Sequence, residues 1–242
     1  MDTSLLKIDK VSKTISDENG IKINLFRDIS FEVNKSDFIS ILASSSTGKS
    51  TLLKIIANIE QPDEGNIVNL NNSKIVYIPS SPSSFPWMTV KENIKIAAGN
   101  DANENHVNKC IKDVGLEGYE NHIPNNASLG FRFRISLARA LSVKPEIILL
   151  DDPFEKFDRE TKFEIYSLLN ELSCKEKYTF ILSTTNITEA LFLSDKIHIL
   201  INRPAKLNKT INVDFHEIRT SDLVFSNNFI AKRIEIEKIF QS

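Results

Sequence analysis

Short apolar runs alternate with stretches of helical periodicity along most of the chain. Residues 38–42 and 146–150 are almost continuously apolar, which is typical of strands buried on both faces. Each run is followed by a stretch of helical period, at residues 52–56 and 160–172. Strands that alternate with helices pair in parallel and need helices on both faces of the sheet. The sequence therefore predicts an α/β fold with a mixed, largely parallel sheet at its core.

Two regions depart from this alternation. Residues 5–8 and 23–33 alternate apolar and polar side chains, as half-buried strands do, and predict an antiparallel β region at the N-terminus. The helical period of the middle of the chain predicts an inserted helical lobe at about residues 87–143. We expect a single domain over residues 1–242, with a C-terminal tail at about residues 203–242.

Composition excludes several classes of protein. The net charge of −2 argues against a general nucleic-acid binder, whose domains are usually strongly basic. Cys110 and Cys174 stand far apart without a C-x-x-C pair, so neither a zinc site nor a disulfide framework is expected. No apolar run approaches the roughly 18 residues of a membrane span. Any membrane association is therefore expected to come through a partner.

A serine-rich loop joins the strand at residues 38–42 to the helix that follows. Its end, Gly48-Lys49-Ser50, matches the second half of the pattern G-x-x-x-x-G-K-[ST], in which backbone N–H groups and the lysine bind phosphate and the hydroxyl binds Mg²⁺. Alanine replaces the first glycine of the pattern. The loop predicts a set of nucleotide-binding residues: Ala43, Ser44, Ser45, Ser46, Thr47, Gly48, Lys49, Ser50 and Thr51.

Two carboxylates, Asp151 and Asp152, follow the apolar run at residues 146–150. A buried strand that delivers an aspartate beside a phosphate loop helps to hold Mg²⁺ in many nucleotide-binding proteins. The sequence therefore predicts Ser50 and Asp151 as metal ligands. One such motif alone arises easily at a strand end, but the two motifs in this order are a specific signal.

With these motifs the chain resembles the ATP-binding cassettes of ABC transporters over essentially its whole length. Residues 127–141 are similar to the signature helix L-S-G-G-x-x-x-R-x-x-x-A-R-A-L of that family, and residues 191–197 to the segment after its switch histidine. Within the family, residues 85–93 resemble the nitrate, sulfonate and taurine importers, where P-W-[LM]-T-V follows the Q-loop. The tail resembles that group more loosely, from residue 203 to residue 235.

The resemblance implies both ligands and partners. ATP with Mg²⁺ is the expected cofactor, held by Lys49, Ser50 and Asp151, with Ile15 at the position that stacks on adenine. Ser128 and Gly130 of the signature would bind the nucleotide of a second cassette. The expected partners are that second cassette, in a homodimer or heterodimer, a transmembrane permease and, in some complexes, a solute-binding protein. The expected location is the cytoplasmic face of the cell membrane.

Several positions lack the residue typical of the family. Ser80 replaces the Q-loop glutamine, Asp152 the catalytic glutamate and Thr185 the switch histidine. Leu129 and Ser46 each replace a glycine, in the signature and in the phosphate loop. Loss of a general base typically lowers a rate about 10²- to 10⁴-fold. We therefore expect nucleotide binding to be retained, and hydrolysis by this chain to be slow or absent.

Three functions remain open at this point. The leading one is an importer ATPase subunit, and the second is a non-catalytic cassette that pairs with an intact partner. A soluble ABC protein of iron–sulfur assembly, repair or translation is disfavoured, because the chain has neither two cassettes nor a coiled-coil insertion. Since the permease and binding protein select the solute, nitrate, sulfonates, taurine, bicarbonate and a pyrimidine precursor are equally compatible with the cassette.

Overall fold

The computed structural model describes residues 4–16, 19–81, 83–99, 103–215 and 219–241. Seventeen helices and strands are assigned within these ranges. In chain order they are β1 (Ser4–Ser16), β2 (Lys22–Asn34), β3 (Phe38–Leu42), α1 (Lys49–Ile56), β4 (Glu64–Asn69), β5 (Ile75–Ile78), α2 (Val90–Ala98), α3 (Glu104–Asp113), α4 (Leu129–Ser142), β6 (Ile147–Asp151), α5 (Arg159–Glu176), β7 (Thr179–Thr184), α6 (Ile187–Leu193), β8 (Lys196–Ile201), β9 (Lys206–Asn212), the 3₁₀ helix η2 (Ser221–Phe225) and α7 (Asn227–Gln241).

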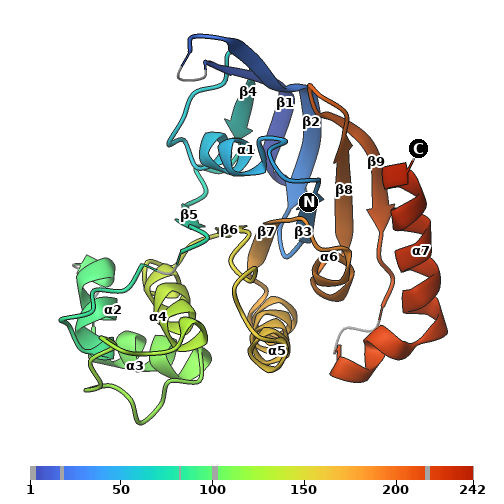
Figure 1. The fold of residues 1–242 in the computed structure, drawn as a ribbon. Helices are drawn as coiled ribbons and strands as arrows, with labels where there is room; N and C mark the ends of the chain where they lie inside the picture. Colours follow the sequence, from blue (N-terminus) through green and yellow to red (C-terminus); the bar gives the residue numbers. More distant parts are fainter. Residues whose placement is uncertain (1–3, 17–18, 82, 100–102, 216–218, 242) are drawn as a thin grey trace.

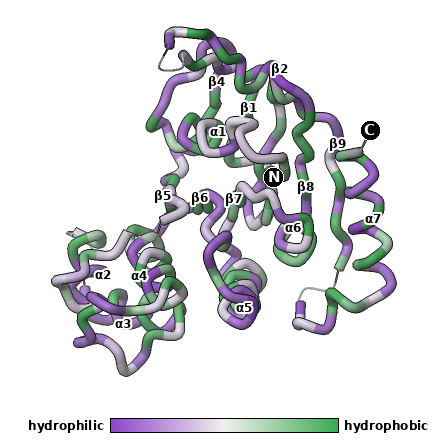
Figure 2. Tube along the Cα trace, in the orientation of Figure 1, coloured by the Kyte–Doolittle hydropathy of each residue, from purple (hydrophilic) through white to green (hydrophobic). Residues whose placement is uncertain are grey.

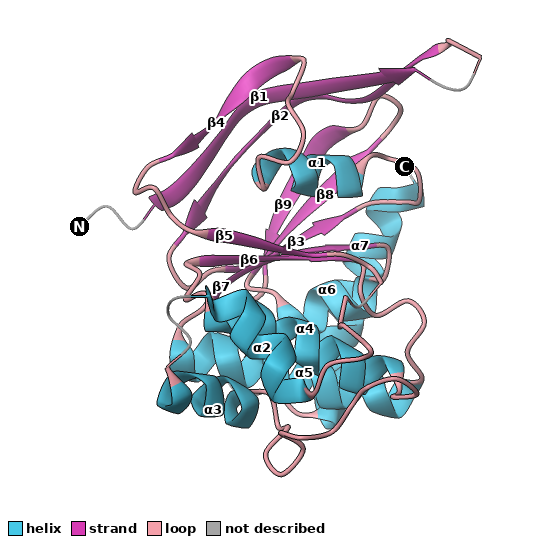
Figure 3. Ribbon diagram, turned by 90° about the vertical axis from the view of Figure 1, so that its left-hand side faces the viewer, coloured by secondary structure: helices cyan, strands magenta, loops and turns pink. Residues whose placement is uncertain are grey.

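Two sheets form the centre of the molecule. The larger has six strands in the order β5-β6-β7-β3-β8-β9, in which all neighbours pair in parallel except β8 and β9. The smaller is a three-stranded antiparallel sheet, β2-β1-β4. Helix α1 lies between the sheets, and the other helices lie mostly beyond the opposite face of the larger sheet (Figure 3). The predicted α/β fold, with a mixed sheet and an N-terminal antiparallel region, is confirmed.

The larger sheet separates two hydrophobic cores. On β6, Ile147 and Leu149 pack in a core with α1 and the smaller sheet, whereas Ile148 and Leu150 pack with residues of α4, α5 and α6. All four side chains are 0% exposed. Because successive side chains of a strand point to opposite faces, a strand covered on both sides must be apolar throughout. This explains the continuous apolar run at β6.

Helices α2, α3 and α4 form the helical lobe beside β5 (Figure 1). The first of them begins at Val90 because Thr89 and Glu92 form a capping box. The Glu92 amide donates to Thr89 Oγ1 at 3.2 Å, and the Thr89 amide donates to Glu92 Oε2 at 2.8 Å. The lobe is inserted in the chain between β5 and β6, which are neighbours in the sheet.

The tail of the chain packs against the edge of the larger sheet. Strand β9 pairs with β8, and α7 lies against α6 and places Phe229 and Ile236 in the core. Hydrophobic and hydrophilic residues are mixed along α7 (Figure 2): Phe229 and Ile236 are buried, whereas Ile230 and Ile234 are exposed. Among the described residues, no helix combines the length and the apolar character that crossing a bilayer requires.

Candidate functional site

The segments that carry the predicted catalytic positions follow four neighbouring strands. Ser80 follows β5, Asp151 ends β6, Thr185 follows β7, and the phosphate loop follows β3. These strands are consecutive in the sheet and run in parallel, so their carboxyl ends lie at the same edge. Open α/β sheets bind ligands at this edge. The topology therefore gathers side chains that lie far apart in the sequence.

The phosphate loop leads into α1, whose positive end faces the loop. Gly48 caps this helix with φ 88°, and a Cβ there would lie 2.9 Å from both Leu25 Cβ and Phe26 Cδ1. Ser46 also has a positive φ, of 62°. A left-handed conformation costs most L-residues about 1–2 kcal/mol. The loop thus adopts a shape that suits glycine at a position where this chain has serine.

Lys49 is buried inside the loop, with an exposed fraction of 7%. Its Nζ donates to the carbonyl oxygens of Ala43 at 3.1 Å and Ser44 at 2.9 Å. Burial lowers the pKa of Lys49, an effect that the nearby carboxylates of Asp152 and Asp151 oppose. A cation enclosed by backbone groups at a helix N-terminus is suited to bind phosphate oxygens.

Asp151 is the centre of a network of hydroxyl groups. Its Oδ1 accepts hydrogen bonds from Ser50 Oγ at 2.9 Å and Ser183 Oγ at 2.7 Å, and its Oδ2 accepts one from the Tyr77 hydroxyl at 2.7 Å. A hydroxyl and a carboxylate in contact form an all-oxygen donor set, which Mg²⁺ prefers. The pair of Ser50 and Asp151 therefore fits this metal, whose remaining ligands are usually water and substrate phosphates.

Asp152 stands beside this pair in an unusual backbone conformation, with φ 43°. Burial raises the pKa of its carboxyl to about 6, and repulsion from Glu189 adds to the shift, while Lys49 acts in the opposite direction. A partly buried carboxyl with a pKa near the physiological range can accept a proton from a reacting group.

The segment after β7 is held by a buried glutamate. Glu189, which is 2% exposed, accepts a hydrogen bond from Thr184 Oγ1 at 2.6 Å and pairs with Lys162 Nζ at 3.0 Å. The amide of Asn186 in turn donates to Thr184 Oγ1 at 3.0 Å. Thr185 lies within this held segment, and its own side chain is exposed. The predicted switch position is therefore exposed, on a segment whose backbone is held by the hydrogen bonds of Thr184.

The predicted signature residues lie in a different place. Ser128 caps α4 by accepting a hydrogen bond from the Phe131 amide at 3.2 Å. At Gly130, a Cβ would lie 2.6 Å from Thr161 Cγ2, so α4 and α5 meet closely there. Leu129 is partly buried against the core. Helix α4 belongs to the helical lobe, remote from α1 (Figure 1). One chain therefore does not bring its signature to its own phosphate loop.

Two other predicted positions are exposed to solvent. Ser80 is exposed just after β5. Ile15 lies next to the turn of the hairpin of β1 and β2, where it pairs with Ile23 and is 39% exposed. An exposed apolar side chain at this position offers a surface on which a planar ring can lie.

Three residues of the site are not predicted by the sequence motifs. Tyr77 and Ser183 donate hydrogen bonds to Asp151, and Glu189 holds the segment after β7. Ser183 could have been found from the end of a buried strand next to β6. Tyr77 and Glu189 carry no motif, because their roles depend on which strands and helices become neighbours.

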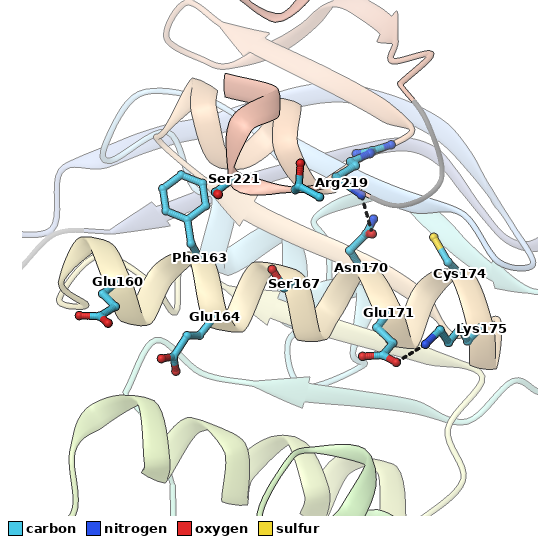
Figure 4. Close-up of a pocket in the computed structure, with 11 residues that line it drawn as sticks. Glu160, Phe163, Glu164, Ser167, Asn170, Glu171, Cys174, Lys175, Arg219 and Ser221 are labelled. Atoms are coloured by element: carbon cyan, nitrogen blue, oxygen red, sulfur yellow. Dashed lines mark hydrogen bonds and ion pairs between the residues drawn. The ribbon is translucent and has the colours of Figure 1, made fainter. Parts of the chain in front are cut away.

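A large groove of about 710 Å³ lies elsewhere on the molecule. It is lined by α5 and residues 219–221 rather than by the phosphate loop. Across it the Arg219 amide donates to Asn170 Oδ1 at 3.2 Å (Figure 4). The Arg219 guanidinium also donates to the carbonyls of Phe192 and Ser194, at 2.9 and 3.0 Å. These bonds attach the tail to α5 and α6.

Comparison with known proteins identifies sequence relatives of this chain. Residues 26–155, which include the phosphate loop and Asp151, match the family model described as ABC transporter. An aliphatic sulfonates import ATP-binding protein SsuB of Bacillus cereus is 35% identical over 217 residues, covering 85% of this chain and 85% of that protein. The uncharacterized ABC transporter ATP-binding protein MJ0412 of Methanocaldococcus jannaschii is 33% identical over 227 residues, covering 88% of this chain and 84% of that protein.

A solved structure shares the fold as well. The ATP-binding cassette MJ0796, in a dimeric post-hydrolysis state bound to ADP and Pi, aligns with a TM-score of 0.73 and 25% identity. The alignment covers 87% of this chain and 100% of that chain. The resemblance to ABC cassettes expected from the motifs, and within them to sulfonate importers, is thus confirmed. The chain belongs to the ABC transporter family, as one of its ATP-binding cassettes.

Proposed function

We propose that this chain is the ATP-binding subunit of an ABC importer that binds MgATP but hydrolyses it slowly. The observation that carries the proposal is the contact of Ser50 Oγ with Asp151 Oδ1, at 2.9 Å, directly after a phosphate loop that encloses Lys49. In ABC proteins generally these groups bind the triphosphate and its metal. The import function follows from the relatives whose names describe sulfonate import.

Nucleotide binding in this proposal depends on groups that the chain retains. The loop amides, the positive end of α1 and Lys49 would bind the phosphates, while Ser50 and Asp151 would hold Mg²⁺. The metal, when bound, neutralises phosphate charge. Ile15 would contact the base through its exposed side chain. These interactions are largely backbone contacts and point charges, which tolerate changes in neighbouring side chains.

Hydrolysis depends on groups that differ from the family's. Water must attack the γ-phosphorus while a base accepts its proton and the bond to the bridging oxygen breaks, giving ADP and phosphate. Asp152 retains the carboxylate but is one methylene shorter than glutamate. Thr185 lacks the imidazole with which the family's histidine contacts the γ-phosphate. Ser80 lacks the amide with which the family's glutamine contacts the metal and the attacking water. We infer slow turnover from these three differences.

The partners in this proposal follow from the placement of the signature. Ser128 and Gly130 lie in the helical lobe, away from the chain's own phosphate loop, so they would complete a site on a second cassette. Leu129 stands where close backbone approach favours glycine. The motion of the pair would drive a small solute through a transmembrane permease at the cytoplasmic face, with a solute-binding protein in some complexes.

A non-catalytic cassette in a heterodimer is the second candidate. It is favoured by the branched side chain of Leu129 in the signature together with the short carboxylate of Asp152, because these weaken both sites of a homodimer. The composition of the native complex separates the candidates. A second, intact cassette that co-purifies in equal amount supports the heterodimer, whereas two copies of this chain support the homodimer.

The direct test is to measure ATP binding and phosphate release with the purified chain and its partners. The wild-type chain is expected to bind MgATP and to release phosphate slowly. The double variant Asp152→Glu, Thr185→His should raise the rate about 10²-fold or more, because it restores a base and a phosphate contact. Lys49→Ala is the control for loss of binding. Equal rates in wild type and double variant would refute the proposed impairment, and absence of ATP binding would refute the function.

A further inference from the structure

The carboxylate of Asp151 is held from both neighbouring strands. On β7, Ser183 pairs directly with Asp151 in the parallel register and donates to Oδ1 at 2.7 Å. On β5, Tyr77 pairs with Leu149, so its side chain shares a face of the sheet with Asp151, two residues further along β6. The Tyr77 hydroxyl crosses to Oδ2 at 2.7 Å. Each oxygen of the carboxylate therefore has a donor on an adjacent strand.

We propose that Tyr77 is a positioning residue that holds the Asp151 carboxylate for Mg²⁺ through its hydroxyl group. The inference rests on the proposed binding of MgATP. Asp151 is 4% exposed, so its orientation is set by protein groups rather than by bulk water. Hydrogen bonds to a carboxylate are short and stronger than those between neutral groups. Partners of this kind orient metal ligands and keep them ready for the metal.

The hydroxyl group, rather than the ring, is the part of Tyr77 that this role requires. A tyrosine hydroxyl carries a proton at neutral pH, so it can donate to the Asp151 carboxylate, as the 2.7 Å contact with Oδ2 shows. The ring is only partly buried beside the core formed with α1. Removal of the oxygen alone therefore leaves the packing in place and removes the donor to Asp151.

The place of Tyr77 in the chain also connects it to the proposed metal site. It lies on β5, three residues before Ser80, at the start of the segment where the family carries the Q-loop glutamine. Serine at position 80 has a shorter side chain than that glutamine and lacks its amide. The hydroxyl of Tyr77 instead links β5 to the metal ligand Asp151. Movement of the segment after β5 would thus be transmitted through this hydrogen bond to the carboxylate that holds the metal.

The test compares ATP binding with and without the metal. ATP is titrated calorimetrically into the full chain in EDTA and at a series of Mg²⁺ concentrations. Tyr77→Phe is expected to raise the Mg²⁺ concentration needed for half of the full effect about tenfold, and to leave ATP affinity in EDTA unchanged. Tyr178→Phe is the matched control, because Tyr178 is a partly buried tyrosine just before β7, at the opposite end of the strand from Ser183. Its Mg²⁺ dependence should equal that of the wild type.

Ser183→Ala provides a second measurement, since it removes the donor that β7 supplies to Oδ1 and should shift the Mg²⁺ dependence in the same direction. Unchanged Mg²⁺ dependence in Tyr77→Phe would overturn this inference and leave the proposed function untouched. Equal weakening of ATP binding in EDTA and in Mg²⁺ would also overturn it, because this result indicates a general packing role. A wild-type chain that binds no ATP in either buffer would refute the proposed function and the inference with it.

Discussion

Replacement of Asp152 by asparagine should stabilise the chain at neutral pH and have a smaller effect in acid. Burial and the neighbouring Glu189 raise the pKa of the Asp152 carboxyl to about 6, whereas an unfolded chain gives aspartate a pKa of about 4. Between these values the folded chain retains a proton that the unfolded chain has lost. The free energy of unfolding therefore falls as the pH rises from about 4 to about 6.

The size of the effect follows from the difference between the two pKa values. Each whole step in pKa corresponds to about 1.4 kcal/mol, so a difference of about two gives about 3 kcal/mol. Because the carboxyl is only partly buried, solvent screening reduces this to about 1–2 kcal/mol. Asp152→Asn removes the charge and should therefore raise the free energy of unfolding by that amount above about pH 6. Below about pH 4 the wild-type carboxyl is neutral, so this contribution disappears.

The assay is urea unfolding followed by circular dichroism at pH 4, 5, 6 and 7.5, without nucleotide or divalent metal. Asparagine also adopts left-handed conformations readily, which affects stability equally at every pH because Asp152 has φ 43°. The informative quantity is therefore the change with pH in the difference between variant and wild type. Glu117→Gln, which neutralises an exposed carboxylate that is not among the charges that shift the pKa of Asp152, should show little change. A difference for Asp152→Asn that is the same at pH 4 and pH 7.5 would refute the reasoning.

Three further predictions, two of which include a rescue substitution, test the site and the residues packed around it. Ser46→Gly should stabilise the chain by about 0.5–1 kcal/mol, since φ is 62° there; a lower urea midpoint would contradict this. Lys162→Met should destabilise it by about 2–3 kcal/mol, because it leaves Glu189 buried and unpaired, and adding Glu189→Gln should recover part of the loss in the same assay. Gly130→Ala should cost about 1–3 kcal/mol, because its Cβ would meet Thr161 Cγ2 at 2.6 Å. Thr161→Ser removes that methyl group and should restore the urea midpoint; no restoration would refute the clash.

The sequence predicts the centre of the fold well because burial on both faces leaves a strong pattern. Strand β6 is apolar at every position from Ile147 to Leu150, since each side chain enters one of two cores. The phosphate loop is predicted for a related reason, because a local backbone shape needs particular residues within a few positions. Both signals are short-range in sequence.

Contacts between distant segments leave no such pattern. Tyr77 lies 74 positions from Asp151, and the two meet because β5 and β6 become neighbours after the helical lobe is inserted between them. Lys162 and Glu189 are likewise joined by the packing of α5 against α6. Polar residues in these positions are compatible with many other placements, so sequence alone could not assign them to the site.

The replaced residues of the site fall into two kinds, and the difference supports the proposed function. Ser46 stands where glycine is usual, yet the backbone there keeps a positive φ, because Gly48 and the start of α1 fix the path of the loop. A backbone conformation imposed by the fold survives such a replacement at a cost in stability. In the proposed function, Thr185 and Ser80 cannot be compensated in this way, because the contacts that the family's histidine and glutamine make need atoms that these side chains lack. We therefore expect phosphate binding, which uses backbone amides, to be retained in this chain. Hydrolysis depends on the length and functional groups of side chains, and we expect it to be weakened.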